Sequence, residues 1–143
     1  EPDSDYLLPF GKGNIITSGD ELTIVSWGAM VQKTIEAIKS LGLDEGQIEL
    51  IDPRTLNPFD LDLIKSSVRK TGKVLIVHED NITCGPGAEL SGKITEQCFE
   101  FLDAPVNRIG SKNSPIPFHK ILEDEILPQI DTISSKIIEL LEY

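Results

Sequence analysis

Three places in this chain carry residue types that could perform chemistry. His78 and Glu79 directly follow a run of four apolar residues, and Asp52 follows another apolar run. A histidine beside a glutamate could act as a general base with an orienting partner, and an aspartate at a strand end could accept a phosphoryl group. The Gly85-Pro86-Gly87 turn precedes an expected helix and could hold a phosphate at the helix N-terminus.

Each candidate lacks a component that its chemistry needs. No serine or cysteine nucleophile accompanies His78 and Glu79 in a local motif, and adjacent residues of an extended chain point to opposite sides. A receiver-type phosphoacceptor also needs paired acids after the first strand, where this chain has Gly28-Ala29-Met30. Pro86 has no N–H group for a phosphate, and neither a G-x-G-x-x-G motif nor a P-loop occurs. The sequence therefore predicts no self-contained active site and favours a binding or assembly module.

The composition is that of an acidic globular protein. The chain has 143 residues and a formal net charge of −11, and its length suits one domain. This charge argues against nucleic acid and anionic membranes as partners and is compatible with a basic protein partner. No apolar run approaches the length of a membrane span. Cys84 and Cys98 lie outside any metal-binding motif, which argues against zinc and is typical of a reducing compartment.

Strand and helix patterns alternate along the chain. Strands are expected at residues 12–17, 22–27, 47–51, 74–77 and 106–109. The expected helices begin at Ala29, after an N-cap at Asp60, near Ala88, at residue 118 and at Pro128. This alternation indicates an α/β fold with a mostly parallel sheet. Right-handed crossovers then place helices on both faces of the sheet.

The expected domain comprises residues 12–143, and residues 1–11 are an extended lead-in with the composition of a linker. The chain opens with Glu1 rather than with a methionine. We therefore expect a domain of a longer chain.

Four blocks of sequence together resemble one known family. They are LTIVSWGAMV at 22–31, IELIDPRTLNPFD at 48–60, TGKVLIVHED at 71–80 and LDAPVNRIGSKNSPIPFHKILED at 102–124. In this order they resemble the C-terminal domain of the transketolase superfamily, in the form found in the beta subunit of thiamine-diphosphate-dependent 2-oxo acid dehydrogenases. The second and fourth blocks are the most specific. The chain departs from the family at Gly85-Pro86-Gly87, where Gly-Gly or Gly-Val-Gly is common.

The resemblance implies a three-layer α/β/α sandwich with five strands, one of them antiparallel. It also implies that thiamine diphosphate, magnesium and the catalytic histidine belong to other domains of the parent enzyme. The domain itself is then expected to be inactive, with no catalytic, cofactor-binding or metal-binding residue. The full enzyme would oxidatively decarboxylate a 2-oxo acid and acylate the lipoyl group of an acyltransferase. The blocks VSWGAMV and VHED and the ending Glu142-Tyr143 favour 2-oxoisovalerate, whereas KILED followed by LPQI favours pyruvate. The expected substrate is 2-oxoisovalerate, with pyruvate as the alternative.

The same resemblance implies partners. The domain would contact the alpha subunit or domain and a second beta subunit, with His78 and Glu79 near a subunit interface. It would dock the peripheral binding domain of the dihydrolipoyl acyltransferase through Asp103 and the terminal residue Tyr143. The simpler alternative is that Asp103 only caps a turn. The expected location is the cytoplasm, or the mitochondrial matrix in a eukaryote. The rival function is a free-standing domain that binds a small ligand or phosphate at Asp52 and His78.

Overall fold

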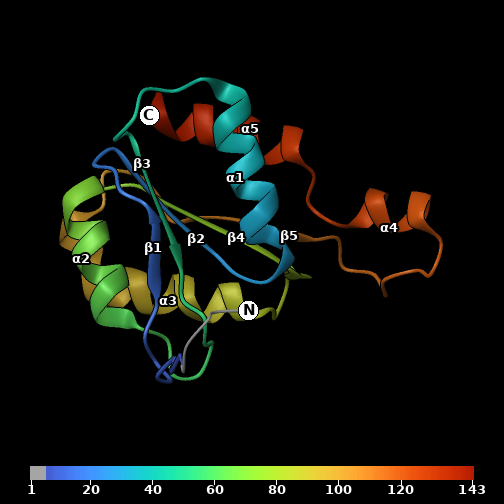
Figure 1. Ribbon diagram of the computed structural model, residues 1–143, viewed down its shortest axis with the longest axis horizontal. Helices are drawn as coiled ribbons and strands as arrows, with labels where there is room; N and C mark the ends of the chain where they lie inside the picture. Colours follow the sequence, from blue (N-terminus) through green and yellow to red (C-terminus); the bar gives the residue numbers. More distant parts are fainter. Residues whose placement is uncertain (1–5) are drawn as a thin grey trace.

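The apolar runs of the sequence form a five-stranded sheet in the computed structural model, which describes residues 6–143 (Figure 1). The strands are β1 (Asn14–Thr17), β2 (Leu22–Ser26), β3 (Ile48–Asp52), β4 (Val74–Asn81) and β5 (Asn107–Ser111). Their order across the sheet is β1-β3-β2-β4-β5. The edge strand β1 is antiparallel to β3, and the other neighbours are parallel. The expected mixed sheet is therefore confirmed; the first five residues of the expected lead-in lie outside the described range.

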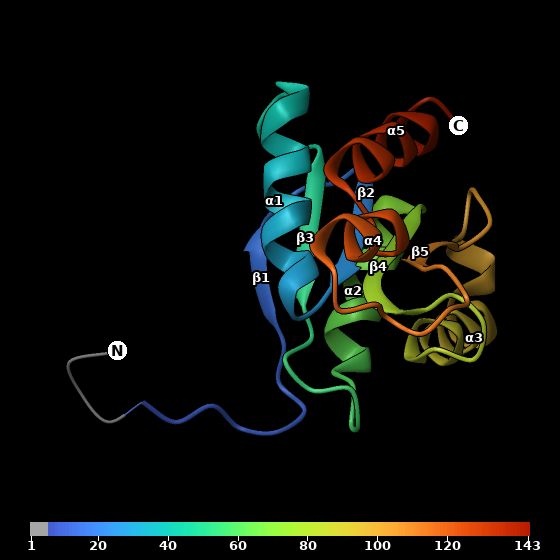
Figure 2. The ribbon, with the colours of Figure 1, turned by 90° about the vertical axis from the view of Figure 1, so that its right-hand side faces the viewer.

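Helices cover both faces of the sheet, which gives the expected three layers (Figure 1; Figure 2). The helices α1 (Ala29–Leu41) and α5 (Ile130–Leu141) share one face, and α2 (Leu61–Thr71) and α3 (Pro86–Cys98) share the other. A short 3-10 helix, η1 (Phe99–Phe101), and the helix α4 (Lys120–Ile126) complete the set. No helix within residues 6–143 combines the length and apolar character that a membrane crossing needs.

The interior strand β4 supplies side chains to both cores. Leu75 and Val77 pack in the core under α1 and α5, whereas Val74 and Ile76 pack in the core under α2 and α3. This alternation follows from the pleat of a strand, in which successive side chains point to opposite faces. The next residue, His78, therefore continues the row that faces α2 and α3.

The chain uses the expected residues to begin and end its helices. Gly42 and Gly72 follow α1 and α2 in the left-handed conformation, with φ of 59° and 68°, which glycine adopts without a side-chain penalty. Asp60 caps α2 by accepting a hydrogen bond from the Leu63 N–H at 3.3 Å. The Asp60 carboxylate also accepts one from the Gly13 N–H at 3.1 Å. One buried carboxylate thus ties the start of α2 to the chain segment that enters β1.

Three boundaries in the second half of the chain differ from the sequence-based expectation. The strand β4 continues to Asn81 rather than ending at residue 77, because Asn81 pairs with Ser111 of β5. The helix α3 begins at Pro86, where proline has a helical φ and no N–H to lose. The helix α5 begins at Ile130 rather than at Pro128, because the intervening Gln129 has an extended backbone. The remaining elements shift by one or two residues at an end.

We predict that Asp60→Ala lowers the free energy of unfolding by about 1–2 kcal/mol, because it removes the N-cap of α2 together with the acceptor of the Gly13 N–H. Urea unfolding followed by circular dichroism measures this loss. The control is Asp62→Ala, which removes a neighbouring acid whose ion pair with Lys65 is exposed and is worth less than about 1 kcal/mol. Equal losses in the two variants would contradict the capping role.

Candidate functional site

The polar residues at the end of β4 separate onto the two faces of the sheet. His78 is fully buried, whereas Glu79 and Asp80 are exposed. A side chain at Gly28, which precedes α1, would bring its Cβ within 3.3 Å of the Glu79 carboxylate. The Glu79 carboxylate thus lies near the N-terminus of α1, a favourable position for a negative charge. Because the two side chains point apart, His78 and Glu79 do not form the general-base pair that their adjacency suggests.

The imidazole of His78 stacks on the indole of Trp27. The ring centroids of His78 and Trp27 are 5.2 Å apart, and the two ring planes differ by 2°. Trp27 also meets Phe59 edge-on, with 6.2 Å between the ring centroids. The register of the sheet explains the stack. Ser26 pairs with Val77 in the parallel strands β2 and β4, so the next residue of each strand lies beside the other.

Three glycines make room for the His78 ring. A Cβ atom at Gly85 would lie 3.1 Å from His78 Cε1, and one at Gly110 would lie 2.9 Å from the same atom. A Cβ atom at Gly87 would collide with His78 Nε2. The turn that begins α3 is therefore shaped around an imidazole of the same chain. This packing explains Gly87 without a phosphate, whereas a Cβ atom at Gly85 would collide first with the Asn81 carbonyl oxygen. Pro86 occupies the first position of the helix.

The environment of His78 favours the neutral imidazole. Burial lowers the pKa of His78 from its ordinary value of 6.5; Asp80 opposes this shift, and Arg108 adds to it. Neither ring nitrogen has a hydrogen-bond partner among residues 6–143. A general base needs a positioned partner from which it takes a proton. The geometry therefore assigns His78 to packing, and only Glu79 of this pair is exposed for direct contact with a partner.

Asp52, the candidate phosphoacceptor, is used by the backbone. Its carboxylate accepts a hydrogen bond from the Arg54 N–H at 2.8 Å, and Arg54 has an unusual positive φ of 58°. No group of three or more His, Cys, Asp or Glu side chains that could hold a metal ion occurs in residues 6–143. Asp52 thus stabilises the irregular loop after β3, and the described chain has no acidic cluster to form a phosphorylation site with it.

Asp103 and Tyr143 lie at the opposite edge of the sheet, where β4 begins. The Asp103 N–H donates to the Gly72 carbonyl at 2.8 Å. The neighbouring Lys73 ammonium donates to the Leu141 carbonyl at the end of α5, at 3.2 Å. The structure therefore brings the Asp103 loop and the last residues to the same end. The Asp103 side chain is exposed, and its carboxylate lies against Gly72, where an added Cβ atom would collide with it.

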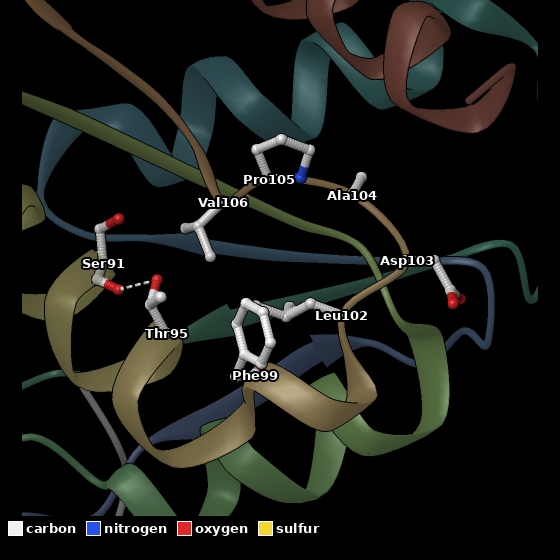
Figure 3. Close-up of a pocket in the computed structure, with 8 residues that line it drawn as sticks. All are labelled: Ser91, Thr95, Phe99, Leu102, Asp103, Ala104, Pro105 and Val106. Atoms are coloured by element: carbon white, nitrogen blue, oxygen red, sulfur yellow. Dashed lines mark hydrogen bonds between the residues drawn. The ribbon is translucent and has the colours of Figure 1, made fainter.

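A shallow hollow of about 510 Å³ opens beside Asp103 (Figure 3). Its walls come from the outer face of α3 and from the loop that leads to β5, and its lining residues are Ser91, Thr95, Phe99, Leu102, Asp103, Ala104, Pro105 and Val106. Figure 3 shows the Phe99 ring beside Leu102, with the Asp103 carboxylate pointing away from both. Phe99 is 76% exposed, so this end of the molecule offers an apolar surface with an acid at its rim.

Both cysteines are free thiols in the described chain. Cys98 is buried in the core under α2 and α3, as its place on an apolar stripe predicts, and burial raises the pKa of its thiol. Cys84 is exposed in the loop before α3 and has a positive φ of 62°.

The sequence analysis did not identify Trp27 or Gly110 as neighbours of His78. Trp27 and His78 each follow an apolar run of the sequence. This shared position at a strand end is the one sequence feature that could have suggested their contact. It becomes a contact only once β2 and β4 are known to be adjacent. The sequence contains no comparable signal for Gly110, which comes from the edge strand β5.

We predict that Gly87→Ala lowers the free energy of unfolding by about 1–3 kcal/mol, because the added methyl group collides with the His78 ring. The matched control is Gly92→Ala in the same helix, where an added Cβ meets nothing within 4 Å. This control should stabilise the chain by about 0.5–1 kcal/mol. Chemical denaturation of both variants measures the contrast, and similar effects of the two substitutions would contradict the proposed packing.

We further predict that acid destabilises the chain through His78. Its folded-state pKa is lowered, so the unfolded chain binds a proton first as the pH falls below 6.5. Stability is fully present above that pH and declines toward the folded pKa by up to about 1.4 kcal/mol per pH unit. His78→Gln should flatten this slope between about pH 7 and pH 5, measured by urea unfolding. An unchanged slope would show that His78 is not the responsible group.

Comparisons with known proteins show the family of this chain. The profile of the family described as "Transketolase, C-terminal domain" matches residues 11–133. The acetoin:2,6-dichlorophenolindophenol oxidoreductase subunit beta of Bacillus subtilis is 36% identical over 140 residues, 98% of this chain and 41% of that protein. The mitochondrial 2-oxoisovalerate dehydrogenase subunit beta 2 of Arabidopsis thaliana is 35% identical over 99% of this chain and 39% of its own length.

Two further similarities extend this set. The pyruvate dehydrogenase E1 component subunit beta of Staphylococcus aureus is 34% identical over 99% of this chain and 43% of that protein. Among solved structures, a split-gene transketolase described as an inactive beta4 tetramer has a TM-score of 0.79 at 25% identity, over 96% of this chain and 44% of that one. The chain thus spans about two fifths of the length of these curated relatives.

Proposed function

This chain belongs to the family of transketolase C-terminal domains, and we propose that it is the C-terminal assembly and docking domain in the beta subunit of a thiamine-diphosphate-dependent 2-oxo acid dehydrogenase. The observation that carries the proposal is the extent of the match. Proteins named as beta subunits are similar over 98–99% of the chain, although the chain covers only 39–43% of them. One domain of such a subunit need not carry the catalytic residues, and this fits the structural roles of His78 and Asp52 at the strand ends.

The residues of this chain do not fit the cofactor of the proposed parent enzyme. Magnesium bound to a diphosphate prefers carboxylate, carbonyl and water oxygens, and residues 6–143 contain no cluster of acidic, histidine or cysteine side chains that could hold a metal. The Gly85-Pro86-Gly87 turn is closed by His78. We propose that thiamine diphosphate and magnesium bind elsewhere in the parent enzyme, and that this domain contributes no catalytic residue.

For the substrate we propose 2-oxoisovalerate, with pyruvate as the alternative. The proposal draws on the blocks VSWGAMV and VHED. The relatives named for acetoin, 2-oxoisovalerate and pyruvate differ by only two percentage points of identity, so overall similarity does not separate the substrates. Turnover of the complete enzyme with each compound separates them.

The proposed partners are the alpha subunit or domain, a second beta subunit and the peripheral binding domain of the dihydrolipoyl acyltransferase. The solved relative described as a beta4 tetramer supports contacts between beta chains. For the acyltransferase we propose the end of the molecule that holds Asp103 and Tyr143. Both residues are exposed there, and the chain's net charge of −11 suits a basic partner.

The rival function, a free-standing domain that binds a small ligand at Asp52 and His78, has less support. His78 is fully buried, and Gly85 and Gly87 of the turn before α3 lie against its ring. The Asp52 carboxylate is engaged by the Arg54 N–H. His78 thus presents no polar group to solvent, and one oxygen of Asp52 is held by the loop after β3.

We predict that this chain alone binds no thiamine diphosphate in the presence of magnesium. Isothermal titration calorimetry should show only heats of dilution, because the described residues lack a diphosphate or metal cradle. A dissociation constant below about 100 µM, equivalent to about 5.5 kcal/mol of binding, would contradict the assignment.

We predict that Asp103→Arg and deletion of Tyr143 each weaken binding of the acyltransferase's peripheral binding domain by about 2 kcal/mol or more. The first variant replaces an anion that would face a basic partner with a cation, and the second removes an exposed residue from the same end of the molecule. Asp62→Arg is the matched control, since it makes the same charge change at an exposed position of α2. Wild-type binding should also depend more steeply on salt than binding of either test variant. Unchanged binding in both test variants at low salt would exclude this surface while leaving the family assignment intact.

A further inference from the structure

Two helices of this domain end at a glycine in the left-handed conformation, and the surroundings of the two glycines differ. Gly42 follows α1 with a φ of 59°, and Gly72 follows α2 with a φ of 68°. A Cβ atom added at Gly42 would meet nothing within 4 Å. A Cβ atom added at Gly72 would collide with a carboxylate oxygen of Asp103 and would lie 2.9 Å from the Asp103 Cγ atom. The backbone conformation explains a glycine at both positions, but the close contact with an acid is particular to Gly72.

The backbone around Asp103 is fixed, so the contact with Gly72 acts on the side chain. The Asp103 N–H donates a hydrogen bond to the Gly72 carbonyl at 2.8 Å, and the Leu102 N–H donates one to the Phe99 carbonyl at 3.2 Å. The next residue, Ala104, is buried in the core under α1 and α5. The carboxylate ends a side chain that can change its rotamer. A methyl group at Gly72 would therefore displace the carboxylate rather than the loop.

The position of this carboxylate does not favour the stability of the domain. Asp103 lies at the C-terminal end of α2, where the carbonyl groups of a helix carry a partial negative charge and disfavour an anion. The two basic residues in the last turn of α2 are engaged with other groups. The Lys70 ammonium pairs with Glu49, and the Arg69 guanidinium lies 5.1 Å from the centroid of the Phe101 ring. A positive group brought by a partner gives this placement of Asp103 a physical reason.

We propose that Gly72 is a positioning residue of the docking surface, because its lack of a side chain sets the place of the Asp103 carboxylate. The inference rests on the proposed function, in which Asp103 faces a basic domain of the acyltransferase. A carboxylate pairs most strongly with an arginine when two parallel hydrogen bonds form, and this pairing requires a fixed geometry. Gly72 contacts no partner in this account and acts through Asp103.

Calorimetric titration with the peripheral binding domain of the dihydrolipoyl acyltransferase tests this role. Gly72→Ala should weaken binding at least about fivefold, although it leaves the net charge of the chain unchanged. The matched control is Gly42→Ala, which adds a methyl group in open space on an equally left-handed backbone and should change binding less than about twofold. Urea unfolding verifies that both variants fold. If either alanine variant does not fold, Gly72→Asn and Gly42→Asn take their place, because asparagine tolerates the left-handed region.

A double-mutant cycle shows whether Gly72 acts through Asp103. In an Asp103→Ala background, Gly72→Ala should change binding less than about twofold, because the carboxylate that it displaces is gone. Gly72→Ala should also flatten the salt dependence of binding, as Asp103→Ala does, because the charge no longer meets its partner closely. A purely structural role of Gly72 at the end of α2 would produce neither result.

The proposal is overturned if Gly72→Ala and Gly42→Ala affect binding equally. It is also overturned if Gly72→Ala weakens binding as strongly in the Asp103→Ala background as in wild type. If Asp103→Ala weakens binding in these cases, the proposed docking surface stands without a role for Gly72. If Asp103→Ala leaves binding unchanged at low salt, the docking surface itself is wrong and the inference fails with it.

Discussion

The burial of one histidine constrains the end of the sheet at which the parallel strands finish. His78 stacks on Trp27, and a Cβ atom at Gly85, Gly87 or Gly110 would crowd its ring. Because interiors are close-packed, a single added methyl group at such a place forces neighbours to move. The register between β2 and β4, the start of α3 and the path of β5 must therefore all agree with the position of one imidazole.

This constraint explains how the strand ends of an α/β domain can carry polar residues without forming a catalytic or ligand-binding site. Ligands in open α/β sheets tend to bind at the carboxyl ends of the strands. In this domain His78, near the end of β4, is fully buried, and the Asp52 carboxylate accepts a hydrogen bond from the loop after β3. The exposed features lie elsewhere. Asp103 and Phe99 line the hollow near the start of β4, and Phe118, Ile121 and Leu122 are exposed on the segment that follows β5. The proposed roles follow this distribution: the domain joins subunits and docks a partner, and the rest of the enzyme performs the reaction.

Features set by neighbouring residues were predictable from the sequence, and features set by the sheet were not. The apolar runs predicted the strands and helices, Asp60 predicted the start of α2 and Gly42 predicted the end of α1. Each of these signals depends on a few adjacent positions. The extension of β4 to Asn81 was missed because it requires pairing with β5. The stack on Trp27 requires the strand order. The helix expected from residue 118 forms as α4 from Lys120, but periodicity alone cannot show whether its apolar residues face the core or the solvent.

The central claim is that His78 is a neutral packing residue rather than a proton carrier. The chain has two histidines, and His119 is exposed, so selective labelling gives two imidazole signals that can be followed by NMR as the pH is lowered. The account predicts that the His78 signal stays that of a neutral ring well below pH 6.5 for as long as the domain remains folded, because burial lowers its pKa. A His78 signal that titrates near or above pH 6.5 in the folded chain would contradict it.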